Sequence, residues 1–150
     1  KPTTRGNEID SIVRNKLWEA GLDYDHGTGH GVGFCLGVHE FPPVISKNIS
    51  SPLKVGQLLS NEPGYYVKDK FGIRLENLVI VQNCVSNDKE FFEFETVSLC
   101  HFERNLINKN LLDKDEIMWI NQYHKFVYLN LKVLLNTKEK QWLKRKTEKI

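Results

Sequence analysis

Apolar residues recur at helical spacing near the N-terminus of the chain. They lie three or four positions apart, as on one face of an α-helix: Ile9, Ile12, Val13 and Leu17. Asn7 is a suitable N-cap before them, and Gly21 is a suitable stop after them. We therefore expect an amphipathic helix over residues 8–20, packed on a sheet.

From residue 33 to residue 100 the pattern becomes that of β-strands, with short apolar runs and alternation. A loop rich in proline and serine is expected from Phe41 to Gly56, and a turn at residues 86–89. On the long strand ending at Val85, Arg74 and Glu76 share a face with Leu78 and Ile80, and the odd positions 73–81 take the other. Strands are predicted over 33–39, 58–62, 71–85 and 91–99, the last antiparallel to the one before it.

The pattern is helical again after residue 105. Asp113 and Glu116 have the spacing of a capping box, and Leu112 and Ile117 that of a hydrophobic staple. Near-helical apolar spacing follows as far as Leu134. A second helix is predicted over 137–147, with Trp142 and Leu143 inward and a lysine-rich outer face, which we interpret as a solvated surface. The chain is thus predicted to be α+β, with an antiparallel-sheet domain at residues 1–100 and a helical extension at 101–150.

Composition narrows the class of protein. The chain has 150 residues, 40% hydrophobic and 27% charged, with a net charge of +2, which is typical of one globular core with or without a helical appendage. So small a charge does not favour nucleic acid as a partner. No apolar run is long enough for a membrane span, and the N-terminus does not have the pattern of a signal peptide.

The cysteines are odd in number and widely spaced: Cys35, Cys84 and Cys100. This spacing does not favour a structural zinc site. We interpret them as reduced thiols of an intracellular protein, with Cys35 and Cys84 in apolar strands. A catalytic cysteine–histidine pair is a weaker alternative, because no residue near Cys35 is placed to activate it.

Candidate chemistry is concentrated in a run of glycine and histidine. His26 and His30 lie in the segment His-Gly-Thr-Gly-His-Gly-Val-Gly, and His39 follows it. The glycines exclude a zinc-binding helix of the HExxH kind, but they allow the backbone to approach a ligand closely. Imidazole is both a metal ligand and a proton carrier.

Two carboxylates complete the candidate set. Glu62 precedes a Pro-Gly turn at the end of a strand, and Glu76 follows Arg74 between apolar neighbours. A carboxylate in such a strand is costly unless a metal or an arginine compensates it. Taken singly, each histidine or glutamate is more often structural, and a glutamate paired with an arginine is common. Together they favour a divalent-metal or acid–base site.

The motifs resemble those of a known family. The segment 26–40 is similar to the signature of M24B metallopeptidases, in the form found in eukaryotic-type Xaa-Pro aminopeptidases (aminopeptidase P). Leu-Ser-Asn-Glu-Pro-Gly-Tyr-Tyr at 59–66 and Phe-Gly-Ile-Arg-Leu-Glu-Asn at 71–77 match the next two motifs in order. The tail, with Phe102, Trp119 and Trp142, also resembles that subfamily; prolidases and creatinases share the first motifs but lack it.

The resemblance implies the C-terminal half of a pita-bread fold and a dinuclear site, most often manganese, with zinc or cobalt as alternatives. It implies His30, Glu62 and Glu76 as metal ligands, Glu76 bridging both ions and Glu62 accepting a proton from an activated hydroxide. It implies further that His39 contacts the scissile carbonyl and that His26 lines the proline pocket. Arg74 is implied to steady Glu76 or the substrate.

The family's remaining ligands, two aspartates, lie upstream of the helix predicted at 8–20. Asp10, Asp23 and Asp25 lie in the wrong motif to replace them. The resemblance therefore implies a fragment that is inactive alone, from a cytoplasmic enzyme that acts on peptides with proline second. The tail helices are expected either to form homodimer contacts, as the resemblance implies, or to pack their apolar faces on the chain's own sheet. The alternatives are a prolidase-like dipeptidase and a binding module without metal.

Overall fold

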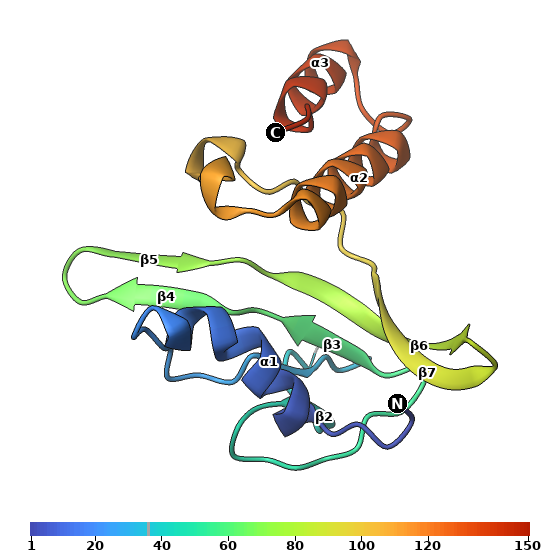
Figure 1. The fold of residues 1–150 in the computed structure, drawn as a ribbon. Helices are drawn as coiled ribbons and strands as arrows, with labels where there is room; N and C mark the ends of the chain where they lie inside the picture. The colour runs from blue at the N-terminus through green and yellow to red at the C-terminus, as the bar shows by residue number, and fades with distance from the viewer. Residues whose placement is uncertain (36) are drawn as a thin grey trace. The chain divides into compact units, whose positions relative to one another are not determined.

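The computed structural model describes residues 1–35 and 37–150 and divides the chain into two compact units, residues 1–98 and 99–150 (Figure 1). Helix α1 (Gly6–Glu19) contacts the sheet of the first unit. Within the described residues, that sheet has five strands in the order β2-β1-β3-β6-β7, all paired antiparallel. Their bounds are β1 (Gly29–Gly31), β2 (Glu40–Ile45), β3 (Leu58–Asn61), β6 (Asn77–Ser86) and β7 (Lys89–Thr96).

A hydrophobic cluster holds this sheet together. Ile9 of α1 and Phe92 of β7 pack against its buried members, which are Ile45, Leu53, Leu59, Val79 and Val81. On β6 the odd positions from Asn77 to Val81 are buried and the even ones less so, as the alternation predicted. The predicted turn at 86–89 is confirmed: Asn87 and Asp88 both have positive φ, which suits a two-residue connection between β6 and β7.

The predicted long strand over 71–85 is wrong in one respect, because it breaks at Leu75 and Glu76. Residues Phe71–Arg74 form β5, which pairs with β4 (Gly64–Val67) in a separate hairpin. The hairpin leads on from β3 and β6 (Figure 1). Pro63 marks the same break on the partner strand, and its carbonyl accepts a hydrogen bond from the Leu75 N–H at 3.2 Å. Glu76 therefore lies exposed at the break, rather than within a half-buried strand.

The glycine run also differs from prediction. The described part of 33–39 is not a strand; Gly33 N–H instead donates to Gly37 O across a loop, at 2.6 Å. The strand is β1, placed between β2 and β3. A Cβ on Gly29 would lie 2.1 Å from Ser60 O, and one on Gly31 would lie 2.1 Å from Glu40 O. Only glycine allows this close approach of neighbouring backbones. Leu36 of the predicted strand lies outside the described residues.

The segment predicted as a loop over 41–56 begins as a strand. Residues Glu40–Ile45 form β2, although Pro42 and Pro43 lie within it. Proline lacks an N–H group, and a strand at the edge of a sheet can contain it because one side needs no ladder partner. β2 is such an edge strand.

Helix α1 contacts the sheet as predicted, but its N-cap and part of its buried face differ from the prediction. Its N-cap is Arg5 rather than Asn7, and its buried residues are Gly6, Asp10 and Arg14. Ile12, expected on the inner face, is 74% exposed. The inner face of the helix is therefore mixed: the partly buried Ile9, Val13 and Leu17 lie on it together with the fully buried Asp10–Arg14 ion pair, described below.

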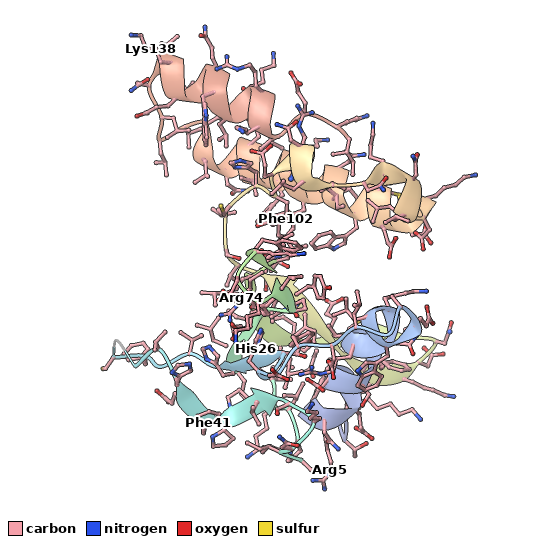
Figure 2. All side chains as sticks on the ribbon, turned by 90° about the vertical axis from the view of Figure 1, so that its left-hand side faces the viewer. Arg5, His26, Phe41, Arg74, Phe102 and Lys138 are labelled. Carbon is pink, nitrogen blue, oxygen red and sulfur yellow. The ribbon has the colours of Figure 1, made fainter. Side chains whose placement is uncertain are left out.

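The second unit consists of helices, as predicted. Two short 3₁₀ turns at Arg104–Leu106 and Lys109–Leu111 precede α2 (Lys114–Leu131) and α3 (Thr137–Lys146). The capping box of Asp113 and Glu116 is confirmed. Phe102 packs against the buried cluster of this unit (Figure 2), which contains Tyr123, Val127 and Leu143. Trp142 was predicted inward but is 47% exposed, with its ring edge-on to His101.

The cysteines are free thiols. Cys84 lies in β6, as predicted, but Cys35 is exposed and outside any strand. Within residues 1–35 and 37–150, no helix has both the length and the apolar character needed to cross a membrane.

We predict that the helical unit loses stability in acid, because His124 is fully buried and its Nε2 accepts from the Phe102 N–H at 3.1 Å. Burial lowers the pKa of His124, and the nearby cations His101 and Arg104 lower it further, against the raising effect of the Glu148 backbone. The unfolded chain then binds more protons as the pH falls below about 6.5, so stability decreases there by up to ~1.4 kcal/mol per pH unit.

Hydrogen exchange of α2 peptides at pH 7.5 and 5.5, corrected for intrinsic rates, measures this decrease. His124→Gln should remove most of it, because a neutral amide can still accept from Phe102. His101→Gln is the matched control and should leave the larger part, since His101 is only half-buried. An unchanged pH dependence in His124→Gln contradicts the prediction.

Candidate active site

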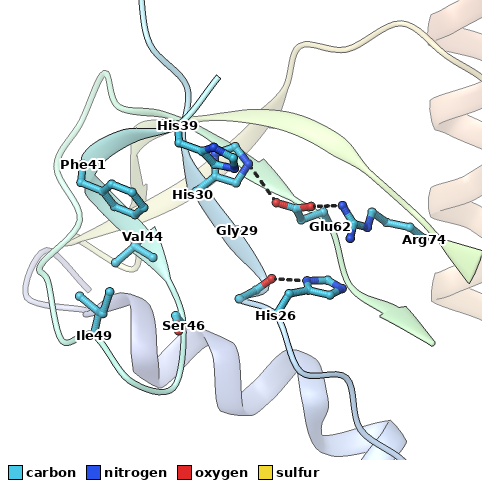
Figure 3. A pocket seen from close by; sticks show the side chains of 11 residues that line it. His26, Gly29, His30, His39, Phe41, Val44, Ser46, Ile49, Glu62 and Arg74 are labelled. Atoms are coloured by element: carbon cyan, nitrogen blue, oxygen red, sulfur yellow. Dashed lines mark hydrogen bonds and ion pairs between the residues drawn. The ribbon is translucent and has the colours of Figure 1, made fainter. Parts of the chain in front are cut away.

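One pocket of about 370 Å³ collects most of the candidate residues (Figure 3). His26, His30 and His39 line it together with Glu62 and Arg74. Phe41, Val44 and Ile49 provide an apolar wall, and the remaining lining residues are Gly27, Gly29 and Ser46. The pocket thus combines imidazoles, one carboxylate and one guanidinium with apolar surface, as ligand sites commonly do.

His30 and Glu62 form the central contact of this pocket. His30 Nε2 lies 3.1 Å from Glu62 Oε1, and Glu62 is only 6% exposed. His30 Nδ1 lies 2.9 Å from Gly31 O, a carbonyl that can only accept, so Nδ1 carries a proton. A neutral ring would then present the lone pair of Nε2 to a carboxylate oxygen. This contact is attractive only with a cation between the two atoms, either a proton or a metal ion.

Ser60 and Arg74 fix the carboxylate of Glu62. Ser60 Oγ donates to Oε1 at 2.9 Å and accepts from the His30 N–H at 3.0 Å. Arg74 Nη1 donates to Oε2 at 2.8 Å. β1, β3 and β5 supply these residues, so the pairing of strands on both sides of Pro63 determines the position of the carboxylate.

Tyr66 connects Arg74 to His26, and the sequence analysis missed it. Its hydroxyl accepts from Arg74 Nε at 2.8 Å and lies 2.9 Å from His26 Nε2. The hydrogen bond to Tyr66 raises the pKa of Arg74, which keeps the guanidinium charged. His26 Nδ1 lies 2.7 Å from Gly27 O and therefore donates, so Nε2 of the neutral ring accepts from the Tyr66 O–H. The only sequence signal was the position of Tyr66 in the Asn-Glu-Pro-Gly-Tyr-Tyr motif.

His39 precedes β2 and lies beside His30, with their ring centroids 4.3 Å apart. Glu76 is the one predicted site residue that does not line the pocket. Within the ranges 1–35 and 37–150, no three histidine, cysteine, aspartate or glutamate side chains group as a metal site would require. His30 and Glu62 therefore fit a divalent metal by the chemistry of their donors, but they supply only two of the ligands such a site needs.

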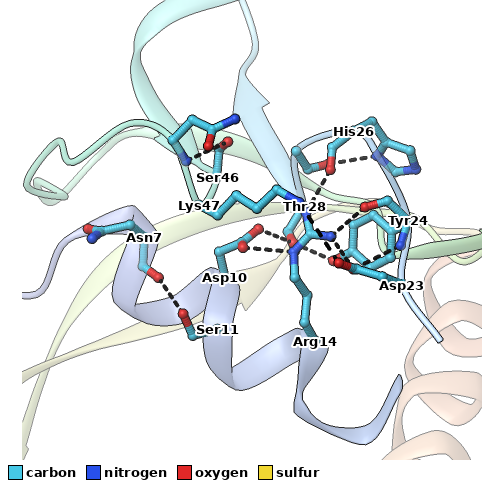
Figure 4. Close-up of polar contacts among 12 residues, drawn as sticks. Asn7, Asp10, Ser11, Arg14, Asp23, Tyr24, His26, Thr28, Ser46 and Lys47 are labelled. Carbon is cyan, nitrogen blue, oxygen red and sulfur yellow. Dashed lines mark hydrogen bonds and ion pairs between the residues drawn. The ribbon is translucent and has the colours of Figure 1, made fainter. Parts of the chain in front are cut away.

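A second polar network lies under the pocket, and it too was missed (Figure 4). Arg14 is fully buried in contact with Asp10, also fully buried, and with Asp23, both at 2.7 Å. Although burial opposes it, the hydrogen bond from Arg14 lowers the pKa of Asp23 to about 2. Burial also opposes the charge on Arg14, but its hydrogen bonds with the two aspartates raise its pKa overall. The sequence analysis had considered Asp10 and Asp23 only as aspartates in the wrong motif to replace the missing metal ligands.

The pocket of the antiparallel-sheet unit thus holds a histidine–carboxylate pair whose donor atoms suit a divalent metal. Comparison with known families places residues 1–83 in metallopeptidase family M24 and residues 90–150 in the C-terminal region of the same peptidases. The chain belongs to metallopeptidase family M24. The resemblance found in the motifs is thereby confirmed.

The relatives agree with this assignment. The probable Xaa-Pro aminopeptidase P of Laccaria bicolor is 43% identical, over 95% of this chain and 24% of the relative. Xaa-Pro aminopeptidase 1 of Dictyostelium discoideum is 46% identical, over 93% of this chain and 24% of the relative.

A solved structure matches the fold. The X-prolyl aminopeptidase of Caenorhabditis elegans, described as a cytosolic enzyme with a di-nuclear active site, superposes with a TM-score of 0.90 and 37% identity, over 99% of this chain and 25% of that one. The α+β fold class is confirmed. The chain spans about a quarter of the length of the relatives it matches.

Proposed function

We propose that this chain is part of a metal-dependent Xaa-Pro aminopeptidase, which removes the N-terminal residue from peptides with proline in second position. The observation that carries the proposal is the approach of His30 Nε2 to Glu62 Oε1, 3.1 Å apart, within a pocket lined by two further histidines, because imidazole and carboxylate are donors that suit a divalent metal. The activity of the relatives named above supports the substrate class.

We propose that His30, Glu62 and Glu76 would hold the metal, together with further donors supplied by parts of the protein outside this chain. Two divalent metal ions, when bound, polarise a peptide carbonyl and lower the pKa of bound water. Manganese is the ion we propose, with zinc or cobalt as alternatives. Because the described residues cluster too few donors, we propose that residues 1–150 alone do not hydrolyse peptides.

The other side chains have proposed roles of their own. Glu62 Oε1 accepts a proton during attack, while Arg74 holds Oε2. His39 donates to the oxygen of the scissile carbonyl, as a histidine can stabilise a developing oxyanion. His26 lines the part of the pocket that takes proline, and Arg74 contacts substrate or steadies the carboxylates.

We propose three further properties of the whole protein. Residues 1–100 are the C-terminal half of the catalytic domain and residues 101–150 a helical extension. That extension contributes to a homodimer, because several apolar side chains of α2, such as Met118, Trp119 and Phe126, are about half exposed. A cytosolic location is proposed from the description of the Caenorhabditis elegans enzyme.

The test is hydrolysis by the full-length protein supplied with manganese. Ala-Pro-Ala should lose its first alanine, Ala-Ala-Ala should not, and treatment with a chelator should stop turnover until metal is restored. Cleavage of the dipeptide Ala-Pro in preference to the tripeptide would replace the proposal with a prolidase. A protein that binds these peptides, but that binds no metal and catalyses no hydrolysis, would be a binding module. That result would show the proposal to be wrong.

A further inference from the structure

We propose that Arg14 of α1 is a positioning residue that holds the segment 23–28 and thereby sets the place of the His26 imidazole in the pocket. The proposal rests on the function proposed above, because it assigns to His26 a role in binding substrate. Arg14 lies outside the pocket and acts only through His26.

Three of the four hydrogen bonds that Arg14 donates end on the segment that contains His26. Its guanidinium donates to Tyr24 O at 2.6 Å, to His26 O at 2.7 Å and to Asp23 Oδ1 at 2.7 Å. Nε donates to Asp10 Oδ2 at 2.7 Å, which anchors the fork to its own helix. A planar guanidinium with five N–H groups can satisfy acceptors in several fixed directions, whereas a lysine ammonium cannot reproduce that geometry.

Asp10 holds the other end of the segment. Thr28 Oγ1 donates to Asp10 Oδ1 at 2.6 Å, and the Tyr24 hydroxyl contacts Thr28 Oγ1 in turn. Thr28 is fully buried. His26 therefore lies between two anchor points, Tyr24 and Thr28, and both are attached to the same Asp10–Arg14 pair (Figure 4).

The ring of Tyr24 transmits this position to the side chain of His26. The guanidinium carbon of Arg14 lies 3.8 Å from the centre of the Tyr24 ring, and that ring lies 4.8 Å from the His26 ring. On its other side the imidazole meets Tyr66, at 2.9 Å. The imidazole is thus held between one residue attached to Arg14 and one attached to Arg74.

A fully buried ion pair is an expensive way to attach a helix to a sheet, because apolar residues of similar volume usually serve as well or better. The pair instead contributes directional contacts: two of its hydrogen bonds fix the backbone carbonyls of Tyr24 and His26, and others fix the side chains of Asp23 and Thr28. A displacement of a substrate-contacting group by about 1 Å can reduce a rate about 100-fold. We therefore expect the effect of Arg14 on turnover to exceed what reduced folding alone explains.

The test compares Arg14→Lys with Arg145→Lys in the full-length, manganese-loaded protein. Arg145 is exposed and on α3, so its substitution is the matched control. Arg14→Lys should reduce kcat/KM for Ala-Pro-Ala about 10- to 100-fold at a temperature where the variant is fully folded, with bound manganese unchanged; Arg145→Lys should have no effect. Thr28→Ser, which keeps the hydroxyl, should retain activity that Thr28→Val loses.

A second measurement does not depend on turnover. Spectra of protein labelled with ¹⁵N histidine, with His26 assigned through His26→Gln, should show the Nδ1–H form in the wild type and a mixture of forms in Arg14→Lys. The proposal is overturned if Arg14→Lys keeps the wild-type His26 signal, or if it lowers only the thermal midpoint and is fully active below it. If Arg14→Lys fails to fold, the proposal is tested by comparing the His26 signal of Thr28→Ser with that of Thr28→Val. A wild type without peptidase activity would refute the proposed function, while the His26 signal would still test the role of Arg14.

Discussion

Glu62→Gln in the full-length, manganese-loaded protein is expected to reduce kcat for Ala-Pro-Ala by about 1000-fold or more. Glutamine keeps the shape of the side chain but removes the charge, so it neither accepts a proton nor balances a cation at His30 Nε2. Loss of a group that binds metal and acts on the reacting water removes several kcal/mol of transition-state stabilisation, and ~4 kcal/mol is ~1000-fold in rate. Initial rates and bound manganese are the two measurements.

The matched control for this substitution is Glu93→Gln, because Glu93 is exposed on β7 and far from the pocket in sequence and sheet order. It should leave rate and metal content at wild-type values. Circular dichroism should be unchanged in both variants. Turnover within tenfold of the wild type in Glu62→Gln would contradict the role we give to this carboxylate.

Arg14→Met is expected to destabilise the first unit by about 3–5 kcal/mol. The substitution leaves Asp10 without its counter-charge at a site with no exposed surface, and breaking a buried pair from one side has a cost of that size. Hydrogen exchange of peptides from α1 and from residues 23–28 in the full-length protein measures the loss locally.

The double variant Asp10→Leu with Arg14→Met gives the prediction its sharpest check. When both charges are removed together, no unpaired ion remains, so most of the lost protection should return. The activity of the double variant should nevertheless stay low, because the anchor points of His26 are gone. A single Arg14→Met variant that loses less than ~1 kcal/mol would show that the pair is not as buried in solution as in the structure.

Elements with a strong local signal could be predicted from the sequence. The capping box of Asp113 and Glu116 marks the start of α2 through residues that are close in sequence. In the turn, Asn87 and Asp88 are residue types that tolerate positive φ. Interactions with distant segments decided the rest. The break at Leu75 depends on Pro63, and β2 is a strand because β1 lies beside it.

The candidate site could be predicted in part, for the same reason. The residue types of His30 and Glu62 indicated metal chemistry, and the fold brings both to one pocket. Nothing local in the sequence indicated that Tyr66 would connect His26 to Arg74, because Tyr66 and His26 are 40 residues apart along the chain. Part of the buried face of α1 was misjudged because apolar spacing was weighed and the Asp10–Arg14 spacing of four residues was not.

The two outer strands of the five-stranded sheet carry residues that disfavour the pairing of a further strand with them. β2 contains Pro42 and Pro43, which offer no N–H to an incoming strand, and β7 presents exposed Lys89, Glu90, Glu93 and Glu95. Prolines and charged side chains on edge strands hinder the addition of further strands. Within the described strands, one border of the sheet is thus protected by missing donors and the other by charge.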